Sequence, residues 1–263
     1  MTRFVLLALV VGAIASCGPK NEKRVRDAAE IAYTVQRLLP HDPKAFTQGL
    51  LIYEGQLYES TGQDSSWIGK VDIGTGVASR KVVLDNKYFG EGIAILNNKV
   101  FQLTWKNTHG FVYRFPSFQQ IGEFTYTGEG WGLTTDGTSL IMSNGTDEIR
   151  FLDSATLKPW RSILVKHRGE PVTNLNELEF ADGFLFANVW QTDLIVRIDP
   201  GTGVVTGFMD LGELTRQARM VNPKADVLNG IAWHPATQTM LVTGKYWPYI
   251  FILKLKKEGD PAN

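Results

Sequence analysis

The tripeptide Glu91-Gly92-Ile93 recurs in altered form along the chain, and this recurrence decides the fold. Each copy has a variable residue, then a residue that is usually glycine, then an aliphatic residue. The five copies are Gln48-Gly49-Leu50, Glu91-Gly92-Ile93, Trp131-Gly132-Leu133, Asn176-Glu177-Leu178 and Asn229-Gly230-Ile231. Successive copies are 43, 40, 45 and 53 residues apart. A period of about 40–50 residues holding four short strands is typical of a β-propeller blade.

The segments between these copies read as short strands. Runs rich in β-branched and aromatic residues alternate with Gly, Asn, Asp and Thr, and long helical periodicity is absent. In the second unit the expected strands are Gly92–Leu96, Val100–Lys106, Gly110–Phe115 and Gln120–Tyr126. The fifth unit supplies only three, namely Gly230–His234, Thr239–Tyr246 and Tyr249–Lys254. We therefore predict an all-β, five-bladed propeller in which the N-terminal strand Tyr33–Leu39 completes the last blade and closes the ring.

The longest insertion between units, residues 207–227, contains a possible short helix at Gly212–Arg219. This helix could overhang a pocket on the ring or cover the edge of a sheet.

The N-terminus reads as a targeting segment. Arg3 precedes an apolar run, Phe4–Ala15, that is too short to span a bilayer, so residues 1–16 are expected to be a signal peptide. The run ends in Ile14-Ala15-Ser16-Cys17-Gly18, which resembles a bacterial lipoprotein cleavage box. Cys17 would then carry the lipid, residues 17–30 would form a charged tether, 31–257 the propeller and 258–263 a tail. The protein would lie in the cell envelope, in the periplasm or on the outer face, and contact the membrane only through its lipid. The alternative is an ordinary signal peptide with an incidental cysteine.

Composition excludes several classes of protein. The 263 residues include 27 basic and 27 acidic side chains, so the chain lacks the basic excess that nucleic-acid binding needs. The single cysteine excludes an intrachain disulfide and a thiolate zinc site. The four histidines, His41, His109, His167 and His234, lack close metal-binding spacing. We expect no cofactor and a monomeric protein.

Function is expected at one mouth of the central channel, because equivalent positions of five blades form rings around the axis. The variable position forms one ring and holds Gln48, Glu91, Trp131, Asn176 and Asn229. A second ring lies fourteen residues later, or sixteen in the last unit, and holds Gly62, Trp105, Gly145, Trp190 and Lys245. A carboxylate, an ammonium group, three amides and three indoles would then surround a small ligand.

These residue types indicate acid–base chemistry on a substrate held between aromatic walls. Burial would raise the pKa of Glu91 and let it exchange protons near neutral pH. Lys245 could stabilise negative charge that develops on oxygen. The indoles could pack an apolar stem or hold an ammonium group. Each residue also has a structural interpretation: a channel carboxylate bonded to amides, an outward-facing lysine, and core tryptophans.

At these residues the sequence resembles the plant and bacterial type of glutaminyl-peptide cyclotransferase, or glutaminyl cyclase. The matching segments span all five units. They are Phe46-Thr47-Gln48-Gly49-Leu50, Tyr58-Glu59-Ser60-Thr61-Gly62, Phe89-Gly90-Glu91-Gly92, Gln102-Leu103-Thr104-Trp105-Lys106, Gly128-Glu129-Gly130-Trp131-Gly132-Leu133, Asn176-Glu177-Leu178-Glu179, Ala187-Asn188-Val189-Trp190, Leu228-Asn229-Gly230-Ile231 and Thr243-Gly244-Lys245-Tyr246.

The resemblance implies a five-bladed propeller and an acyl transfer within one substrate. The α-amine of an N-terminal glutamine, in a peptide or protein, attacks its own side-chain amide and gives pyroglutamate and ammonia. The resemblance also implies that no metal is needed. The family's catalytic residues would fall on Glu91 and Lys245, and its substrate-binding residues on Phe46, Gln48, Phe89, Trp105, Trp131, Asn176 and Trp190.

We expect Glu91 to take a proton from the α-amine and deliver it to the leaving nitrogen. Lys245 and an amide from Gln48 or Asn176 would bind the oxyanion.

Two other classes of function remain open from the residues alone. In a metal-dependent propeller lactonase or related hydrolase, Glu91, Asn176 and Asn229 would ligate a divalent cation, although Lys245 beside that site would repel it. In a non-catalytic envelope protein, the same ring would recognise a peptide or sugar without changing it.

Overall fold

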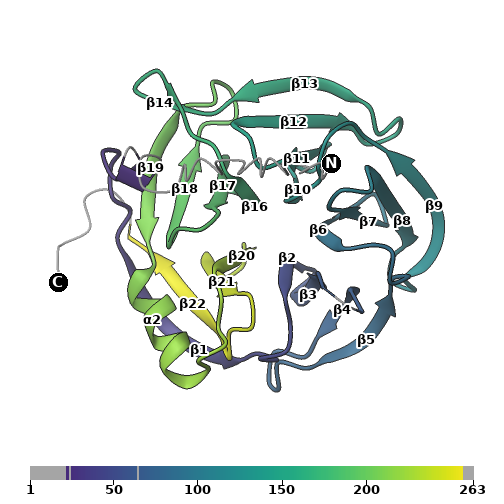
Figure 1. Cartoon of the computed structure of the whole chain (residues 1–263), viewed down its shortest axis with the longest axis horizontal. Helices are drawn as coiled ribbons and strands as arrows, with labels where there is room; N and C mark the ends of the chain where they lie inside the picture. The colour runs from purple at the N-terminus through teal and green to yellow at the C-terminus, as the bar shows by residue number, and fades with distance from the viewer. Residues whose placement is uncertain (1–21, 24, 64, 257–263) are drawn as a thin grey trace, which may run out of the picture.

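The chain folds into a ring of five four-stranded antiparallel sheets around a central axis (Figure 1). The computed structural model describes residues 22–23, 25–63 and 65–256. The expected signal peptide (1–16), Cys17 and the tail (258–263) lie outside these residues. Within the described ranges, no helix has both the length and the apolar character needed to cross a membrane.

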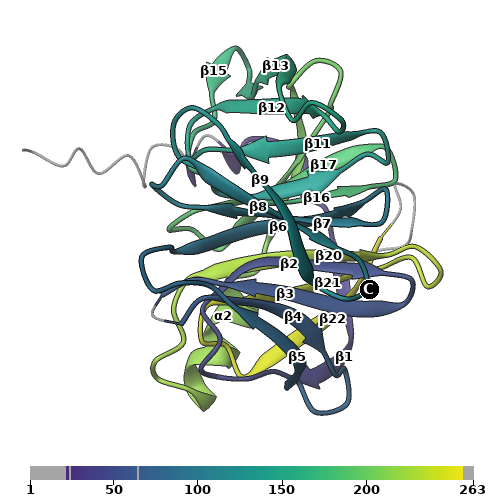
Figure 2. The ribbon, with the colours of Figure 1, turned by 90° about the vertical axis from the view of Figure 1, so that its right-hand side faces the viewer.

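Four blades each take their strands from one continuous segment, in chain order from the axis outward. Blade 1 has β2 (Thr47–Tyr53), β3 (Gln56–Thr61), β4 (Trp67–Val71) and β5 (Ala78–Val83). Blade 2 has β6 (Gly90–Leu96), β7 (Lys99–Thr104), β8 (His109–Arg114) and β9 (Gln119–Thr125). Blade 3 has β10 (Leu133–Thr135), β11 (Ser139–Ser143), β12 (Glu148–Asp153) and β13 (Pro159–Leu164). Blade 4 has β16 (Leu175–Ala181), β17 (Phe184–Val189), β18 (Leu194–Ile198) and β19 (Val205–Asp210). A two-stranded ribbon, β14 (Lys166–His167) and β15 (Glu170–Pro171), lies between blades 3 and 4 in the sequence. In side view, β9 crosses in front of the strands of blade 2 that lie nearer the axis (Figure 2).

Blade 5 joins the two ends of the chain, as the sequence predicts. Its strands β20 (Leu228–His234), β21 (Thr239–Gly244) and β22 (Tyr249–Leu255) come from the end of the domain, and β1 (Tyr33–Pro40) is its outermost strand. The antiparallel register of β1 and β22 runs from Tyr33 opposite Leu255 to Pro40 opposite Tyr249. This pairing closes the ring and covers the edge of β22.

The repeated glycine follows from the crowding of innermost strands at the axis. A Cβ on Gly49 would lie 2.8 Å from the amide nitrogen of Ile93, in the next blade. On Gly92 it would lie 2.4 Å from the nitrogen of Leu133, and on Gly132 it would lie 2.2 Å from the carbonyl oxygen of Asn176. Only glycine therefore allows the inner strands of blades 1 to 4 to approach this closely.

The innermost strand is also irregular at the variable position. The registers of β2 with β3, β6 with β7, β16 with β17 and β20 with β21 all shift there. Such bulges change the direction in which a side chain points.

Blade 4 has Glu177 at the position where the other blades have glycine. The carboxylate of Glu177 reaches the backbone of two other blades near the axis. Its two oxygens accept hydrogen bonds from the backbone nitrogens of Leu50 (3.1 Å) and Ile231 (2.8 Å), in blades 1 and 5. Burial raises the pKa of Glu177 well above its usual value. Glu177 thus links three blades. Its signal in the sequence was the departure from glycine in the repeat.

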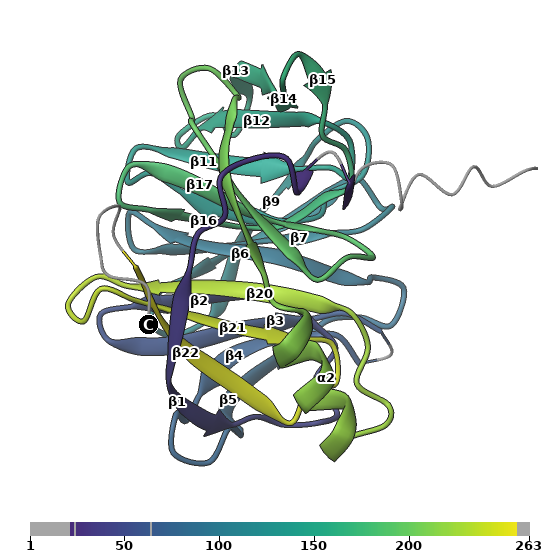
Figure 3. The same ribbon diagram turned by 90° about the vertical axis from the view of Figure 1, so that its left-hand side faces the viewer.

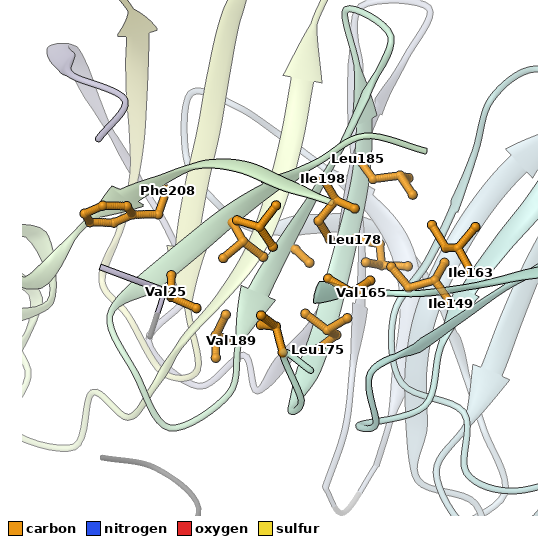
Figure 4. Packing of buried hydrophobic residues seen from close by; sticks show 14 of the residues in the cluster. Val25, Ile149, Ile163, Val165, Leu175, Leu178, Leu185, Val189, Ile198 and Phe208 are labelled. Carbon is orange, nitrogen blue, oxygen red and sulfur yellow. The ribbon is translucent and has the colours of Figure 1, made fainter. Parts of the chain in front are cut away.

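The folded part begins earlier than the sequence suggests. Val25 is fully buried in the core cluster shared by blades 3 and 4, where Figure 4 places it between Phe208 and Val189. The backbone of residues 29–31 hydrogen-bonds Phe208, and Arg26 pairs with Asp210. The expectation that folded structure begins only at residue 31, after a charged tether, is therefore wrong, because Val25 and the backbone from residue 29 already pack on blade 4. Because charged residues surround Val25 in the sequence, its burial in the core could not be recognised there.

The insertion before blade 5 forms the expected helix, α2 (Gly212–Val221). Its buried residues Leu214 and Ala218 belong to the core cluster that contains Trp247 and Phe251. Figure 3 shows α2 beside the ends of β21 and β22. Of the two expected roles, α2 therefore covers a sheet.

The closing strand offers a matched test of its contribution to stability. Leu39 is 2% exposed and packs into the core between blades 5 and 1, whereas its neighbour Leu38 is 44% exposed. Leu39→Ala should lower the free energy of unfolding by about 2–5 kcal/mol because it leaves a cavity. Leu38→Ala should change it by less than about 1 kcal/mol. Thermal or urea unfolding measures both, and equal losses would contradict the assignment of β1 as the closing strand.

Candidate active site

A cavity of about 200 Å³ lies at one mouth of the channel. All nine catalytic and binding residues expected from the sequence line it, together with Gln63. They are Phe46, Gln48, Phe89, Glu91, Trp105, Trp131, Asn176, Trp190 and Lys245. The structure therefore brings together side chains from all five blades.

Glu91 lies on β6 and is 3% exposed. Its Oε1 accepts a hydrogen bond of 2.8 Å from the Nε2 of Gln48. Its Oε2 is buried and has no hydrogen-bond partner among the described residues. Burial raises the pKa of Glu91 well above its usual value, Glu129 raises it further, and Lys245 opposes the shift. An oxygen without a partner in a carboxylate of raised pKa is suited to accept a proton from a ligand.

A row of amides fixes the position of Glu91. The Nδ2 of Asn229 donates 3.0 Å hydrogen bonds to the Oε1 of Gln48 and to the carbonyl oxygen of Thr47. Both ends of the Gln48 amide are therefore engaged within the protein. Asn229 is fully buried and does not line the cavity. Asn176 does line it, and its Oδ1 has no hydrogen-bond partner among the described residues.

Lys245 directly follows β21, and its backbone is held on both sides. Its amide donates to the carbonyl of Val227, and its carbonyl accepts from the amide of Asp226. The preceding Gly244 is required because a Cβ there would lie 2.2 Å from the indole nitrogen of Trp247. The ammonium nitrogen lies 4.5 Å from the ring centroid of Phe46. Burial lowers the pKa of Lys245, and Glu91 and Asp226 partly oppose this effect.

Aromatic rings in edge contact form the walls of the cavity. Phe89 lies 5.9 Å from Phe46 and 5.5 Å from Trp105, measured between ring centroids. Trp131 and Trp190 meet edge to face at 5.5 Å. Two of these contacts, Phe46 with Phe89 and Trp131 with Trp190, join neighbouring blades, and the contact of Phe89 with Trp105 lies within blade 2.

The second ring of positions makes room for these walls. A Cβ on Gly62 would lie 2.2 Å from the ring of Phe89, and a Cβ on Gly145 would lie 2.7 Å from the indole of Trp131. Glycine at these two positions therefore lets the neighbouring aromatic side chain turn toward the cavity.

Glu129 holds two of the tryptophans that line the cavity, and the sequence did not point to it as a site residue. Its Oε2 accepts hydrogen bonds from the indole nitrogens of Trp105 (2.7 Å) and Trp131 (2.8 Å). One carboxylate oxygen thus fixes the planes of two tryptophans from different blades. Its position two residues before Trp131, between two glycines, was the available signal.

Comparison with known proteins identifies the family. The family model described as glutamine cyclotransferase matches residues 6–255. The chain belongs to the glutamine cyclotransferase family. It is 42% identical over 223 residues to a glutaminyl-peptide cyclotransferase of Arabidopsis thaliana, which covers 83% of this chain and 69% of the relative.

Solved structures agree with this membership. The chain superposes on the crystal structure of Myxococcus xanthus glutaminyl cyclase with a TM-score of 0.82 and 35% identity, covering 87% of this chain and 98% of the other. It also matches the WD40 β-propeller domain of Doa1 with a TM-score of 0.50 and 10% identity, over 80% of this chain and 63% of the other. That second match concerns the propeller fold alone. The family fold and the repeats in the sequence thus give the same architecture.

The geometry does not favour a metal-dependent propeller lactonase or related hydrolase. Of the three proposed ligands, Asn229 donates to Gln48 and lies outside the cavity. Within the described ranges, no three acidic, histidine or cysteine side chains gather into a metal-binding group.

Proposed function

We propose that the protein converts an N-terminal glutamine of a peptide or protein to pyroglutamate and ammonia. Family membership supports the reaction, and the unpartnered buried oxygen of Glu91 inside the cavity supports the chemistry. A cavity of about 200 Å³ has room for one side chain with its α-amine, which suits a substrate that reacts with itself.

The first step forms the ring. The α-amine, whose pKa of about 7.7–8.0 leaves part of it neutral at pH 7, attacks the side-chain amide carbon. A carbon–nitrogen bond forms, the carbonyl electrons move to oxygen, and Glu91 Oε2 takes a proton from the attacking nitrogen. Because burial raises its pKa, Glu91 accepts this proton more readily than an exposed carboxylate would.

The second step expels ammonia. Glu91 delivers its proton to the amide nitrogen, the bond between that nitrogen and the amide carbon breaks, and the carbonyl reforms in the lactam. Protonation is needed because the amide anion is a very poor leaving group.

Lys245 and the Asn176 amide would bind the oxygen while it is negatively charged. Donors of this kind contribute about 2.7–4 kcal/mol each. Asn176 is favoured over Gln48 because Gln48 is occupied by Glu91 and Asn229. The aromatic walls exclude water, whose attack would give glutamate instead of pyroglutamate.

Glu129 should set the pH at which the enzyme becomes active. Its negative charge raises the pKa of Glu91, which must be ionised to accept a proton. Glu129→Gln should therefore move the acid limb of the kcat/KM profile to lower pH. Glu129→Ala should in addition raise KM by about tenfold, because both indole nitrogens lose their acceptor. An unchanged acid limb in both variants would show that Glu129 acts only on the position of the walls.

A direct assay tests the function. The pure protein is incubated with a glutamine-terminated peptide, and mass spectrometry should detect the loss of one ammonia. Binding without a change in mass would indicate a non-catalytic binding protein. Activity abolished by a chelator and restored by calcium would indicate a metal-dependent enzyme.

We further propose that the enzyme is a monomer held at the bacterial cell envelope by a lipid on Cys17. The cleavage-box sequence before Cys17 supports the lipid anchor. Palmitate labelling of the expressed protein should be lost in Cys17→Ser, and labelling that persists would contradict it.

A further inference from the structure

A second hollow of about 160 Å³ adjoins the cavity and shares Gln63, Phe89 and Trp105 with it. Its remaining lining residues are Asn86, Lys87, Tyr88, Lys106 and Asn107. We call this hollow the rim groove. Cavities of about 180 and 270 Å³ elsewhere on the protein share no lining residue with the active-site cavity. The rim groove is thus placed to receive whatever extends from a bound N-terminal glutamine.

The rim groove is lined by two ammonium groups, those of Lys87 and Lys106. The ammonium nitrogen of Lys106 lies 4.0 Å from the ring centroid of Trp105, on the wall shared with the cavity. That of Lys87 lies 4.9 Å from the ring of Tyr88 and 3.6 Å from a carboxylate oxygen of Asp85. Among the described residues, those that line the groove include these two lysines and no acidic side chain.

Local contacts hold the residues that line the groove. The side-chain amide of Asn107 donates 3.3 Å to the carbonyl of Lys87, which joins the loop after blade 1 to the loop between β7 and β8. The ring of Tyr88 stacks on His109 at 5.5 Å and meets Phe111 edge to face. Each lysine therefore lies next to a packed aromatic residue, Lys87 beside Tyr88 and Lys106 beside Trp105.

We propose that the rim groove binds the second and third residues of the substrate and favours acidic side chains there. The inference rests on the proposed cyclisation of N-terminal glutamine. An extended chain advances about 3.3–3.6 Å per residue, so the residues directly after the glutamine reach the groove. A carboxylate there is attracted to Lys87 and Lys106, whereas a lysine is repelled.

The test compares three amidated peptides, Gln-Glu-Ala, Gln-Ala-Ala and Gln-Lys-Ala. A second set carries the glutamate or the lysine at the third position instead of the second. The kcat/KM for the glutamate peptide should exceed that for the lysine peptide by about three- to tenfold at low ionic strength. The ratio should approach one in about 1 M salt, where the screening length falls to about 3 Å.

Variants assign the preference to the groove. Lys106→Glu should invert the ratio, and the double variant Lys87→Gln with Lys106→Gln should bring it to about one. Lys81→Gln is the matched control, because Lys81 lies 4.2 Å over the ring of Trp67 but lines neither the cavity nor the groove. It should keep the ratio of the unmodified enzyme.

The outcomes separate the two proposals. Equal kcat/KM for the glutamate and lysine peptides would contradict the proposed role of the rim groove and leave the proposed cyclisation untouched. The same holds if Lys106→Glu does not change the ratio of the two values. No pyroglutamate from any peptide would overturn the proposed function, and the groove with it.

Discussion

Glu91→Gln should lower kcat for glutamine cyclisation by about 10²–10⁴-fold, the usual contribution of a general acid–base group. The substitution keeps the size of the side chain but removes the proton acceptor at Oε2. Folding should be intact, because removing a buried carboxylate of raised pKa relieves a desolvation cost. Steady-state kinetics with a glutamine-terminated peptide, together with thermal unfolding, measures both effects.

Glu179 provides a matched control for this experiment. It is also buried, with its pKa raised to about 8, but it lines a cavity that shares no residue with the active-site cavity. Its oxygens accept from the backbone nitrogen of Trp233 and the hydroxyl of Thr134. Glu179→Gln should retain activity. Near-normal turnover in Glu91→Gln would remove Glu91 from the mechanism, and equal losses in both variants would indicate a structural cause.

Lys245→Met should lower kcat by about 10²–10³-fold, as expected for the loss of one oxyanion donor. Methionine can keep the apolar stem in contact with the ring of Phe46, so KM should change much less. Because the charge of Lys245 lowers the pKa of Glu91, the acid limb of kcat/KM should move to higher pH. This shift is opposite to the one expected for Glu129→Gln.

The exposed Lys99, at the start of β7, provides the control, and Lys99→Met should behave as the unmodified enzyme. A defect of Lys245→Met confined to KM would reassign Lys245 to substrate anchoring. An acid limb that does not move would show that Lys245 and Glu91 are not coupled in the working enzyme.

The sequence alone predicted the blade count and the closing strand, because both follow from local patterns. Repeats such as Glu91-Gly92-Ile93 mark the innermost strand of each blade, and hydrogen bonding within a blade links consecutive segments. The short fifth unit showed that one strand had to come from elsewhere in the chain. The anchor at Val25 escaped prediction because a single apolar residue among charges has no recognisable period.

The composition of the site was also readable, since equivalent positions in a closed ring must converge. The hydrogen bonds that determine the chemistry of the site could not be predicted from the sequence. Gln48 donates to Glu91 from a neighbouring blade, Glu129 joins two indoles, and Glu177 spans the axis to two further blades. Each contact joins residues far apart in the chain, and its geometry depends on how closely the blades pack. The sequence by itself therefore predicted most of the side chains that line the cavity, although not Gln63, and wrongly placed Asn229 among them. Only the tertiary structure decided which of their atoms are bonded and which remain open to a substrate, because that depends on contacts between blades.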